Sequence, residues 1–456
     1  MDALTQEEKL VFIFLVILLA SCTRMEQYRT DYDKCTSTQP EEDCRDSSFQ
    51  EYLNKDKRSE DCYLGFVEFD DQGQLWDREQ LRSLFKQLYL ESKDDDLLLV
   101  VFVHGWKHSA KAGDENIRNF RNSLKRLSAM ESAIAVASST DARKIAGIYL
   151  GWRGGSSTVP VLKELTFWDR KNIAHKVGYG DVTEVLSRLE QLQKTKNEGT
   201  GSNRTYLVVV GHSFGGAVVY SALSEILENG FINPDGPIGR SSNTVGIGDL
   251  VVLINPAFEA MRYSTLSDMS TDRGTYFPGQ LPVLAILTSE GDDATGKMFP
   301  LGRWFSTLFE KEREVKRHNA VTGKKEPISQ SDANITAVGH FDDYITHHLS
   351  AAKTPDLKQS SAFDVGGEVS VFKLAGEDWE KDKPGNTINF AGSTLVRTKK
   401  SAGRNPYLNI RVDAELIPDH NKIYDPRIEN FVRQLILIAS QDRKLETRQK
   451  LRAGIK

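Results

Sequence analysis

The chain has little cysteine, no excess of positive charge and no apolar run long enough to cross a bilayer comfortably. Its 456 residues include four cysteines, all near the N-terminus, and their spacing matches no common zinc arrangement. The formal net charge is -5, and no basic stripe stands out before residue 443. This argues against nucleic acid as a partner. The apolar stretch Val11–Ala20 has the length of a signal-peptide core instead.

The residues that follow this stretch resemble the lipobox of bacterial lipoproteins. They are Leu19–Cys22 (LASC), and the resemblance implies cleavage before Cys22 and a lipid on its thiol. The acidic residues before the stretch outnumber Lys9, which departs from the positive start of a signal peptide. Residues 1–21 are therefore read as a lipoprotein-type signal peptide, with an uncleaved membrane anchor or an ordinary cleaved signal as alternatives. We expect an exported protein attached to a membrane of the bacterial cell envelope.

The next segment, residues 22–62, is polar and without apolar periodicity, which predicts a tether between membrane and domain. If Cys22 carries lipid, three cysteines remain and at most one disulfide forms. Cys35 and Cys44 would close the shortest loop, and free thiols in a reducing compartment are the alternative. A folded domain is predicted over 63–440, followed by a basic tail, 441–456.

The order of elements in this domain predicts an α/β fold. A strand at Tyr63–Phe69, a helix at Arg78–Leu90 and a buried strand at Asp96–Val103 are the start of a parallel sheet with helical crossovers. We therefore expect a mostly parallel central sheet flanked by helices. Further strands are predicted at Lys144–Trp152, Asp249–Ile254, Leu281–Leu287 and Tyr407–Val412, and further helices at Asn116–Leu127, Val182–Leu192 and Pro426–Ile438.

Ser213 lies on a strand-to-helix turn. The valine-rich run Tyr206–Val210 reads as a buried strand, and Ala217–Leu227 has apolar residues at helical spacing. Gly211 and Gly215, two positions before and after the serine, allow the strained backbone of such a turn. The turn also directs the amide of Phe214 and a helix dipole at any oxygen bound there, which suits a developing oxyanion.

GHSFGG in this setting resembles the α/β-hydrolase superfamily, in particular its lipase- and esterase-like serine hydrolases. The resemblance implies an α/β-hydrolase fold with cap or lid insertions, no metal or other cofactor, and a triad in the chain order serine, acid, histidine. His104 and Gly105 follow the buried strand that ends at Val103. In that superfamily such a pair opens the loop that supplies the second oxyanion amide, here that of Trp106.

The acid and the histidine are assigned by position. Glu290, Asp292 and Asp293 all follow a predicted strand downstream of the serine. Asp292 is favoured because Ser289–Asp292 resembles the G-x-x-D spacing that follows this strand in the superfamily. His420 lies between the last predicted strand and the last helix, where this fold keeps its base. The competing histidines, which with their neighbouring carboxylates could instead form a metal site, are His340, His347 and His348.

Two insertions interrupt the predicted core, at 153–181 and 298–400. Each could be part of a cap or a packed elaboration, and Phe299–Phe309 could be a lid touching acyl chains or ordinary core. The sequence as a whole predicts a serine hydrolase acting on carboxylic esters, with an ester or lipid as substrate. The alternatives are a thioesterase, acyltransferase or peptidase on the same scaffold, or a catalytically inactive, membrane-tethered binding protein.

Overall fold

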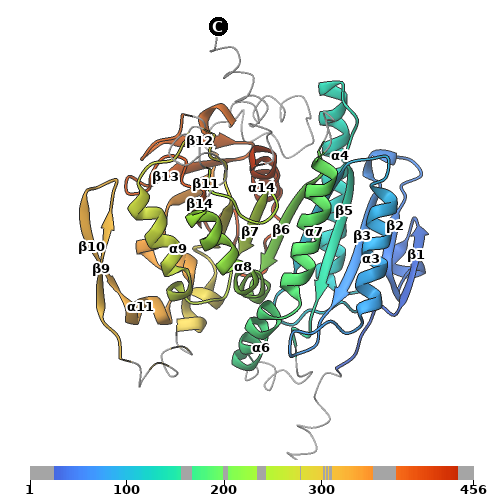
Figure 1. Ribbon diagram of the computed structural model, residues 1–456, viewed down its shortest axis with the longest axis horizontal. Helices are drawn as coiled ribbons and strands as arrows, with labels where there is room; N and C mark the ends of the chain where they lie inside the picture. Colours follow the sequence, from blue (N-terminus) through green and yellow to red (C-terminus); the bar gives the residue numbers. More distant parts are fainter. Residues whose placement is uncertain are drawn as a thin grey trace, which may run out of the picture.

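A 12-stranded sheet runs through the whole molecule (Figure 1). The computed structural model describes residues 25–155, 167–198, 204–233, 243–277, 279–300, 303, 307, 311–352, 376–379 and 381–439. The spatial order of the strands is β1-β2-β3-β5-β4-β6-β7-β8-β14-β11-β13-β12. Their bounds are β1 Asp31–Ser37, β2 Ser47–Tyr52, β3 Cys62–Glu68, β4 Leu97–Val103, β5 Lys144–Gly151, β6 Tyr206–His212, β7 Leu250–Ile254, β8 Leu284–Ser289, β11 His347–Ala351, β12 Thr387–Phe390, β13 Ser393–Arg397 and β14 Tyr407–Val412.

The centre of the sheet is parallel. Every pairing from β3 across to β11 is parallel, whereas β2 with β3, β11 with β13 and β13 with β12 are antiparallel. Parallel strands need crossover connections, and the helices that make them cover both faces of the sheet. The carboxyl ends of the central strands therefore meet along one edge of the sheet.

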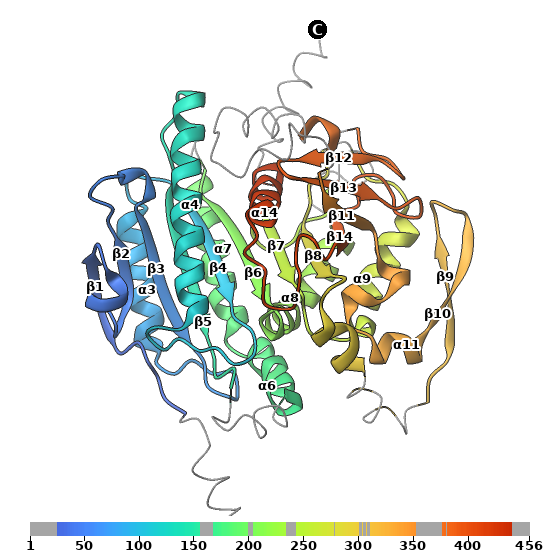
Figure 2. The ribbon, with the colours of Figure 1, turned by 180° about the vertical axis from the view of Figure 1, so that it is seen from behind.

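Successive residues of the buried strands face two separate cores. On β4, Leu97, Leu99 and Val101 belong to one core, and Leu98 and Val100 belong to the other. The helices that cover the first core appear at the front of Figure 1, and those that cover the second core appear at the front of Figure 2. The expected α/β organisation, a mostly parallel sheet flanked by helices, is thereby confirmed. The helices of the first core are α3 Arg78–Glu91, α6 Phe167–Tyr179, α7 Val182–Asn197, α8 Phe214–Ile232 and α9 Ala260–Arg273, and those of the second are α4 Glu115–Ser138 and α14 Pro426–Ala439.

The prediction of a tether over residues 22–62 is wrong for Asp31–Tyr52. This segment forms β1, the short helix α2 Pro40–Asp43 and β2, which extend the sheet beyond β3. A disulfide joins Cys35 to Cys44, and Cys62 is buried and free. The segment gives no apolar signal because an edge strand such as β1 is polar along its length and the buried part of β2 includes Ser47, Ser48 and Gln50.

The N-terminal stretch Val11–Ala20 and Cys22 lie outside the described residues, as does the tail 441–456. Among the helices that the structure does describe, none is both long enough and apolar enough to span a membrane.

The two predicted insertions are largely regular structure where they are described. Within 153–181, α6 packs on α8 so closely that a methyl group at Gly178 would lie 2.4 Å from the carbonyl oxygen of Val218. The region 298–400, predicted as an insertion, adds β11, β13 and β12 to the sheet. It also contains the hairpin β9 Glu314–Asn319 and β10 Lys324–Ser329, helix α11 Gln330–Ile335, and the 3-10 turns η3 Val338–His340 and η4 Asp342–Tyr344.

Candidate active site

Ser213 lies in the turn between β6 and α8, in a conformation that few residues adopt. Its φ is 57° and its ψ is -122°. Its N–H donates to the carbonyl oxygen of Ile254 at 3.0 Å. A methyl group at Gly215 would lie 2.0 Å from the carbonyl oxygen of Val103, and one at Gly211 would lie 2.7 Å from the carbonyl oxygen of Gly215. The tight turn therefore requires both glycines, as the sequence predicts.

His420 lies between Ser213 and Asp292. Its Nε2 is 2.7 Å from Ser213 Oγ, and its Nδ1 is 2.9 Å from each carboxylate oxygen of Asp292. The three residues follow β6, β8 and β14, so the common edge of the parallel strands brings them together from distant parts of the chain. Because a carboxylate only accepts, Nδ1 carries the hydrogen and Nε2 is left to accept the hydroxyl hydrogen of Ser213.

Asp292 is the only one of the three candidate acids that is buried. Burial raises its pKa, but hydrogen bonds from His420 and Thr295 outweigh burial and hold the pKa below its ordinary value. Asp292 is therefore ionised at neutral pH and can stabilise a positively charged imidazole. Glu290 and Asp293 are exposed, and Asp293 forms an ion pair with Lys297 at 2.7 Å.

The loop that carries His420 is held by two side chains that the sequence analysis did not identify. The backbone oxygen of His420 accepts hydrogen bonds from His212 Nε2 and Asn255 Nδ2, each at 3.0 Å. Burial lowers the pKa of His212 to about 3, so its ring is neutral. Asn255 also accepts from the N–H of Ser289, which ties the loop to the end of β8. The position of His212 directly before Ser213 is the sequence feature that could have identified it.

The turn after β4 lies directly against Ser213. A methyl group at Gly105 would come within 2.7 Å of Ser213 Cβ, and Trp106 is next in the chain. His104 is fully buried, burial lowers its pKa to about 4, and its Nε2 accepts the N–H of Trp152 at 3.1 Å. The rings of His104 and Trp152 are stacked, so His104 fixes this turn and does not reach Ser213 itself. Phe214, on the other side of the serine, is the first residue of α8.

The competing histidines do not contact Ser213. Nε2 of His340 lies 3.0 Å from the hydroxyl oxygen of Thr295, behind Asp292. His347 is buried on β11 beside Thr346, and His348 is exposed. Within the described ranges, no group of three or more His, Cys, Asp or Glu side chains is arranged to hold a metal ion.

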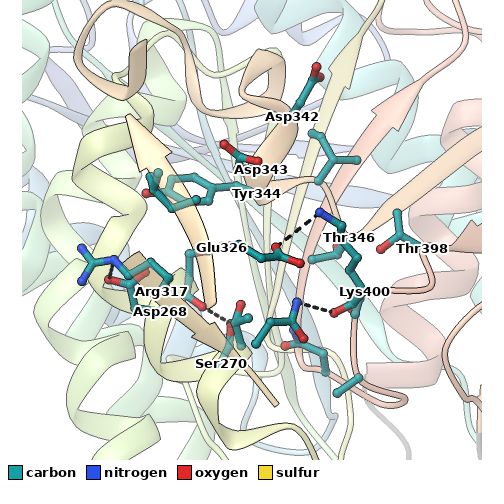
Figure 3. Close-up of a pocket in the computed structure, with 18 of the residues that line it drawn as sticks. Asp268, Ser270, Arg317, Glu326, Asp342, Asp343, Tyr344, Thr346, Thr398 and Lys400 are labelled. Atoms are coloured by element: carbon teal, nitrogen blue, oxygen red, sulfur yellow. Dashed lines mark hydrogen bonds and ion pairs between the residues drawn. The ribbon is translucent and has the colours of Figure 1, made fainter. Parts of the chain in front are cut away.

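A cavity of about 400 Å³ lies beside α9, away from Ser213 (Figure 3). Its wall includes the ion pair of Arg317 with Asp268, at 2.8 Å, and that of Lys400 with Glu326, at 3.3 Å. None of Ser213, Asp292 and His420 is among its lining residues. The cavity and the Ser213 site are therefore separate features of the molecule.

Ser213, His420 and Asp292 thus form one hydrogen-bonded arrangement at the edge of an α/β sheet. Protein-family models, curated proteins and solved structures were each compared with this chain, and none matches it.

Proposed function

We propose that this chain is a serine hydrolase with the α/β-hydrolase fold and that it cleaves carboxylic esters through Ser213, His420 and Asp292. The observation that carries the proposal is the unbroken hydrogen-bond path from the Ser213 hydroxyl through both ring nitrogens of His420 to a buried, ionised carboxylate. The strained turn at Ser213 and the chain order serine, acid, histidine also support it, because both are typical of that superfamily.

In the proposed reaction, His420 removes the Ser213 proton as Oγ attacks the ester carbonyl. Asp292 stabilises the imidazolium, and the backbone amides of Trp106 and Phe214 hold the oxyanion of the tetrahedral intermediate. The imidazolium then protonates the leaving alcohol, which leaves an acyl group on Ser213. His420 next deprotonates a water molecule that attacks this acyl-enzyme, and the carboxylic acid departs as Ser213 regains its proton.

Covalent labelling tests whether Ser213 is activated. A fluorophosphonate probe should label the full-length protein, and Ser213→Ala should abolish labelling without lowering the melting temperature. Ser221→Ala is a matched control, because the Ser221 hydroxyl also lies beside a buried imidazole, 2.8 Å from His175 Nδ1. Among the described residues, His175 has no hydrogen bond to a carboxylate, so this variant should still be labelled. Labelling that survives in Ser213→Ala would refute the assignment.

A substrate series separates esters from the alternatives. Thioesters, amides and other acyl acceptors can be served by the same triad, so the triad does not select among them. We expect turnover of p-nitrophenyl esters, and the preferred acyl length, measured from acetate to laurate, distinguishes an esterase from a lipase. Turnover of thioesters or peptides alone would replace the ester proposal. Absence of turnover on all of these substrates would favour an inactive binding protein.

We also propose that the chain is attached to a bacterial membrane through Cys22. The support is the LASC sequence at Leu19–Cys22 after a short apolar run. A clickable fatty acid supplied to expressing bacteria should be incorporated into the wild-type protein, and Cys22→Ser should lose it and leave the membrane fraction. A Cys22→Ser protein that remains in the membrane fraction would indicate an uncleaved anchor.

A further inference from the structure

The carboxylate of Asp292 has a second partner besides His420, and that partner contacts another imidazole. The backbone N–H of Thr295 donates to Asp292 Oδ1 at 3.1 Å, and its hydroxyl forms a short hydrogen bond with Oδ2. The same hydroxyl oxygen lies 3.0 Å from Nε2 of His340. His340, which competes with His420 as a candidate base in the sequence, therefore lies on the side of Asp292 away from His420.

The direction of these hydrogen bonds follows from which groups can donate. A carboxylate only accepts, so the single hydroxyl hydrogen of Thr295 points to Asp292. The Thr295 oxygen must then accept from His340, which assigns the ring hydrogen to Nε2 of His340. Hydrogen bonds in a chain polarise one another, so a hydroxyl that accepts from His340 donates more strongly to Asp292.

The surrounding backbone fixes the ring of His340. The turn η3 is anchored by a hydrogen bond from the N–H of Val338 to the carbonyl oxygen of Phe258, at 3.1 Å. The ring lies against Gly296, where a methyl group would be 3.3 Å from Cε1 of His340. The position of the imidazole is thus set by two separate segments.

Burial keeps the ring of His340 neutral at pH 7, with charged groups of both signs around it. Burial lowers its pKa below the ordinary value; Asp292 and Asp342 act to raise it, and Arg411 and His420 act to lower it. Asp342 is paired with Arg411 at 2.6 Å, and both line the cavity of Figure 3, where Asp342 is labelled. What His340 supplies to Thr295 at neutral pH is therefore a hydrogen-bond donor and not a charge.

We propose that Thr295 and His340 are positioning residues of the hydrolytic site, which limit the negative charge that Asp292 presents to His420 and so set the pH at which the site becomes active. The inference rests on the proposed function and deepens it. Neither residue touches the reacting atoms. His340 acts only through the hydroxyl of Thr295, and this restriction makes the proposal testable.

The first test is the pH profile of kcat/KM for a p-nitrophenyl ester, measured on the full-length chain. Thr295→Val removes the hydroxyl but keeps the shape, so Asp292 should bind the imidazolium form of His420 more strongly. The acid limb should then move to higher pH by about 0.7 unit, since a hydrogen bond is worth roughly 1 kcal/mol and one pKa unit about 1.4 kcal/mol. Thr295→Ser, which keeps the hydroxyl, should match the wild type.

The variants of His340 test whether it acts through Thr295. His340→Ala should move the acid limb in the same direction by a smaller amount, and His340→Gln, which keeps a donor, should reduce the shift. The double variant with Thr295→Val should shift no further than Thr295→Val alone. The control is His318→Ala, an exposed histidine on β9 bonded to Asp272, which should cause no shift. Additive shifts, or no shift in His340→Ala, would overturn the proposal.

A second readout does not depend on turnover. The proton between Nδ1 of His420 and Asp292 should give a low-field ¹H NMR resonance in the wild-type chain, whatever reaction the protein catalyses. This resonance should move further downfield in Thr295→Val and, less far, in His340→Ala, and should stay in place in Thr295→Ser. If no ester is hydrolysed but the resonance behaves in this way, the ester proposal fails, while the inferred effect of Thr295 and His340 on the hydrogen bond between Asp292 and His420 stands. An unchanged resonance in both Thr295→Val and His340→Ala would overturn the inference even in an active enzyme.

Discussion

Replacing Gly215 by alanine tests the geometry of the Ser213 turn most directly. The added methyl group would lie 2.0 Å from the carbonyl oxygen of Val103 and 2.6 Å from that of His104. Ordinary contacts of this kind begin at 3.4 Å. The start of α8 must therefore move away from the end of β4 by about 1 Å, because both clashing atoms belong to the backbone and cannot rotate aside.

Such a movement displaces Ser213 and the amide of Phe214 together. A misplacement of about 1 Å typically costs roughly 100-fold in rate, and overpacking of this kind costs about 1–3 kcal/mol of stability. We expect the rate of fluorophosphonate labelling to fall by about that factor, with a lower midpoint in urea. Gly279→Ala is the matched control, since its nearest neighbour, Asn243 Nδ2, would be 3.5 Å away. A Gly215→Ala protein that is labelled at the wild-type rate with unchanged stability would refute the reasoning.

Three other changes have expected outcomes. Asp292→Asn should lower kcat by about 10⁴-fold while the fold persists, because an amide can hold the imidazole in the wrong tautomer; a loss below 10-fold in an esterase assay would contradict the role of the acid. Burial raises the pKa of Glu259, but Lys171 and Arg303 outweigh burial and hold it at about 2. Because this pKa is depressed, the ionised Glu259 carboxylate stabilises the folded state by roughly 3 kcal/mol above about pH 4. This stabilisation is lost as the pH falls toward 2. Urea titrations should therefore show that the difference in unfolding free energy between wild type and Glu259→Gln decreases over that pH window. A difference that stays constant would exclude the ion pairs of Glu259 as its cause. Cys35→Ser should lower the free energy of unfolding by about 2–3 kcal/mol, since the disulfide closes a short loop. An equal urea midpoint with and without reductant in the wild type would argue against this contribution of the disulfide.

The buried centre of the sheet could be predicted from the sequence because parallel strands covered on both faces are continuous apolar runs. The strand predicted at Tyr407–Val412 has the bounds of β14, and β4 begins one residue after its predicted start. The strands at the edges could not be found in this way. β1 and β9 consist mostly of exposed and partly buried polar residues, and β11 has two histidines in five residues, so neither apolar periodicity nor a continuous apolar run marks them.

The same difference decides which residues of the candidate site could be predicted from the sequence. Ser213, Asp292 and His420 could be selected because each follows a recognisable buried strand, and the structure brings them into hydrogen-bond contact; their catalytic role stays a prediction. Thr295 and His340 meet only in the folded chain, where η3 returns to the end of β8. A local signal was nevertheless present, because an aspartate with a threonine three residues later can accept both its backbone and side-chain hydrogens. That pattern selects Asp292 over Asp293, which is followed at the same distance by a glycine.

The position of β14 has a consequence for how the chain is made. β14 pairs with β8 on one side and with β11 on the other, although β11, β12 and β13 all precede it in the sequence. On the ribosome, the nascent chain therefore has an uncovered edge at β8 and a detached three-stranded ribbon until the C-terminal segment emerges. The same late segment brings His420, so a chain released early would lack both a continuous sheet and the imidazole that contacts Ser213.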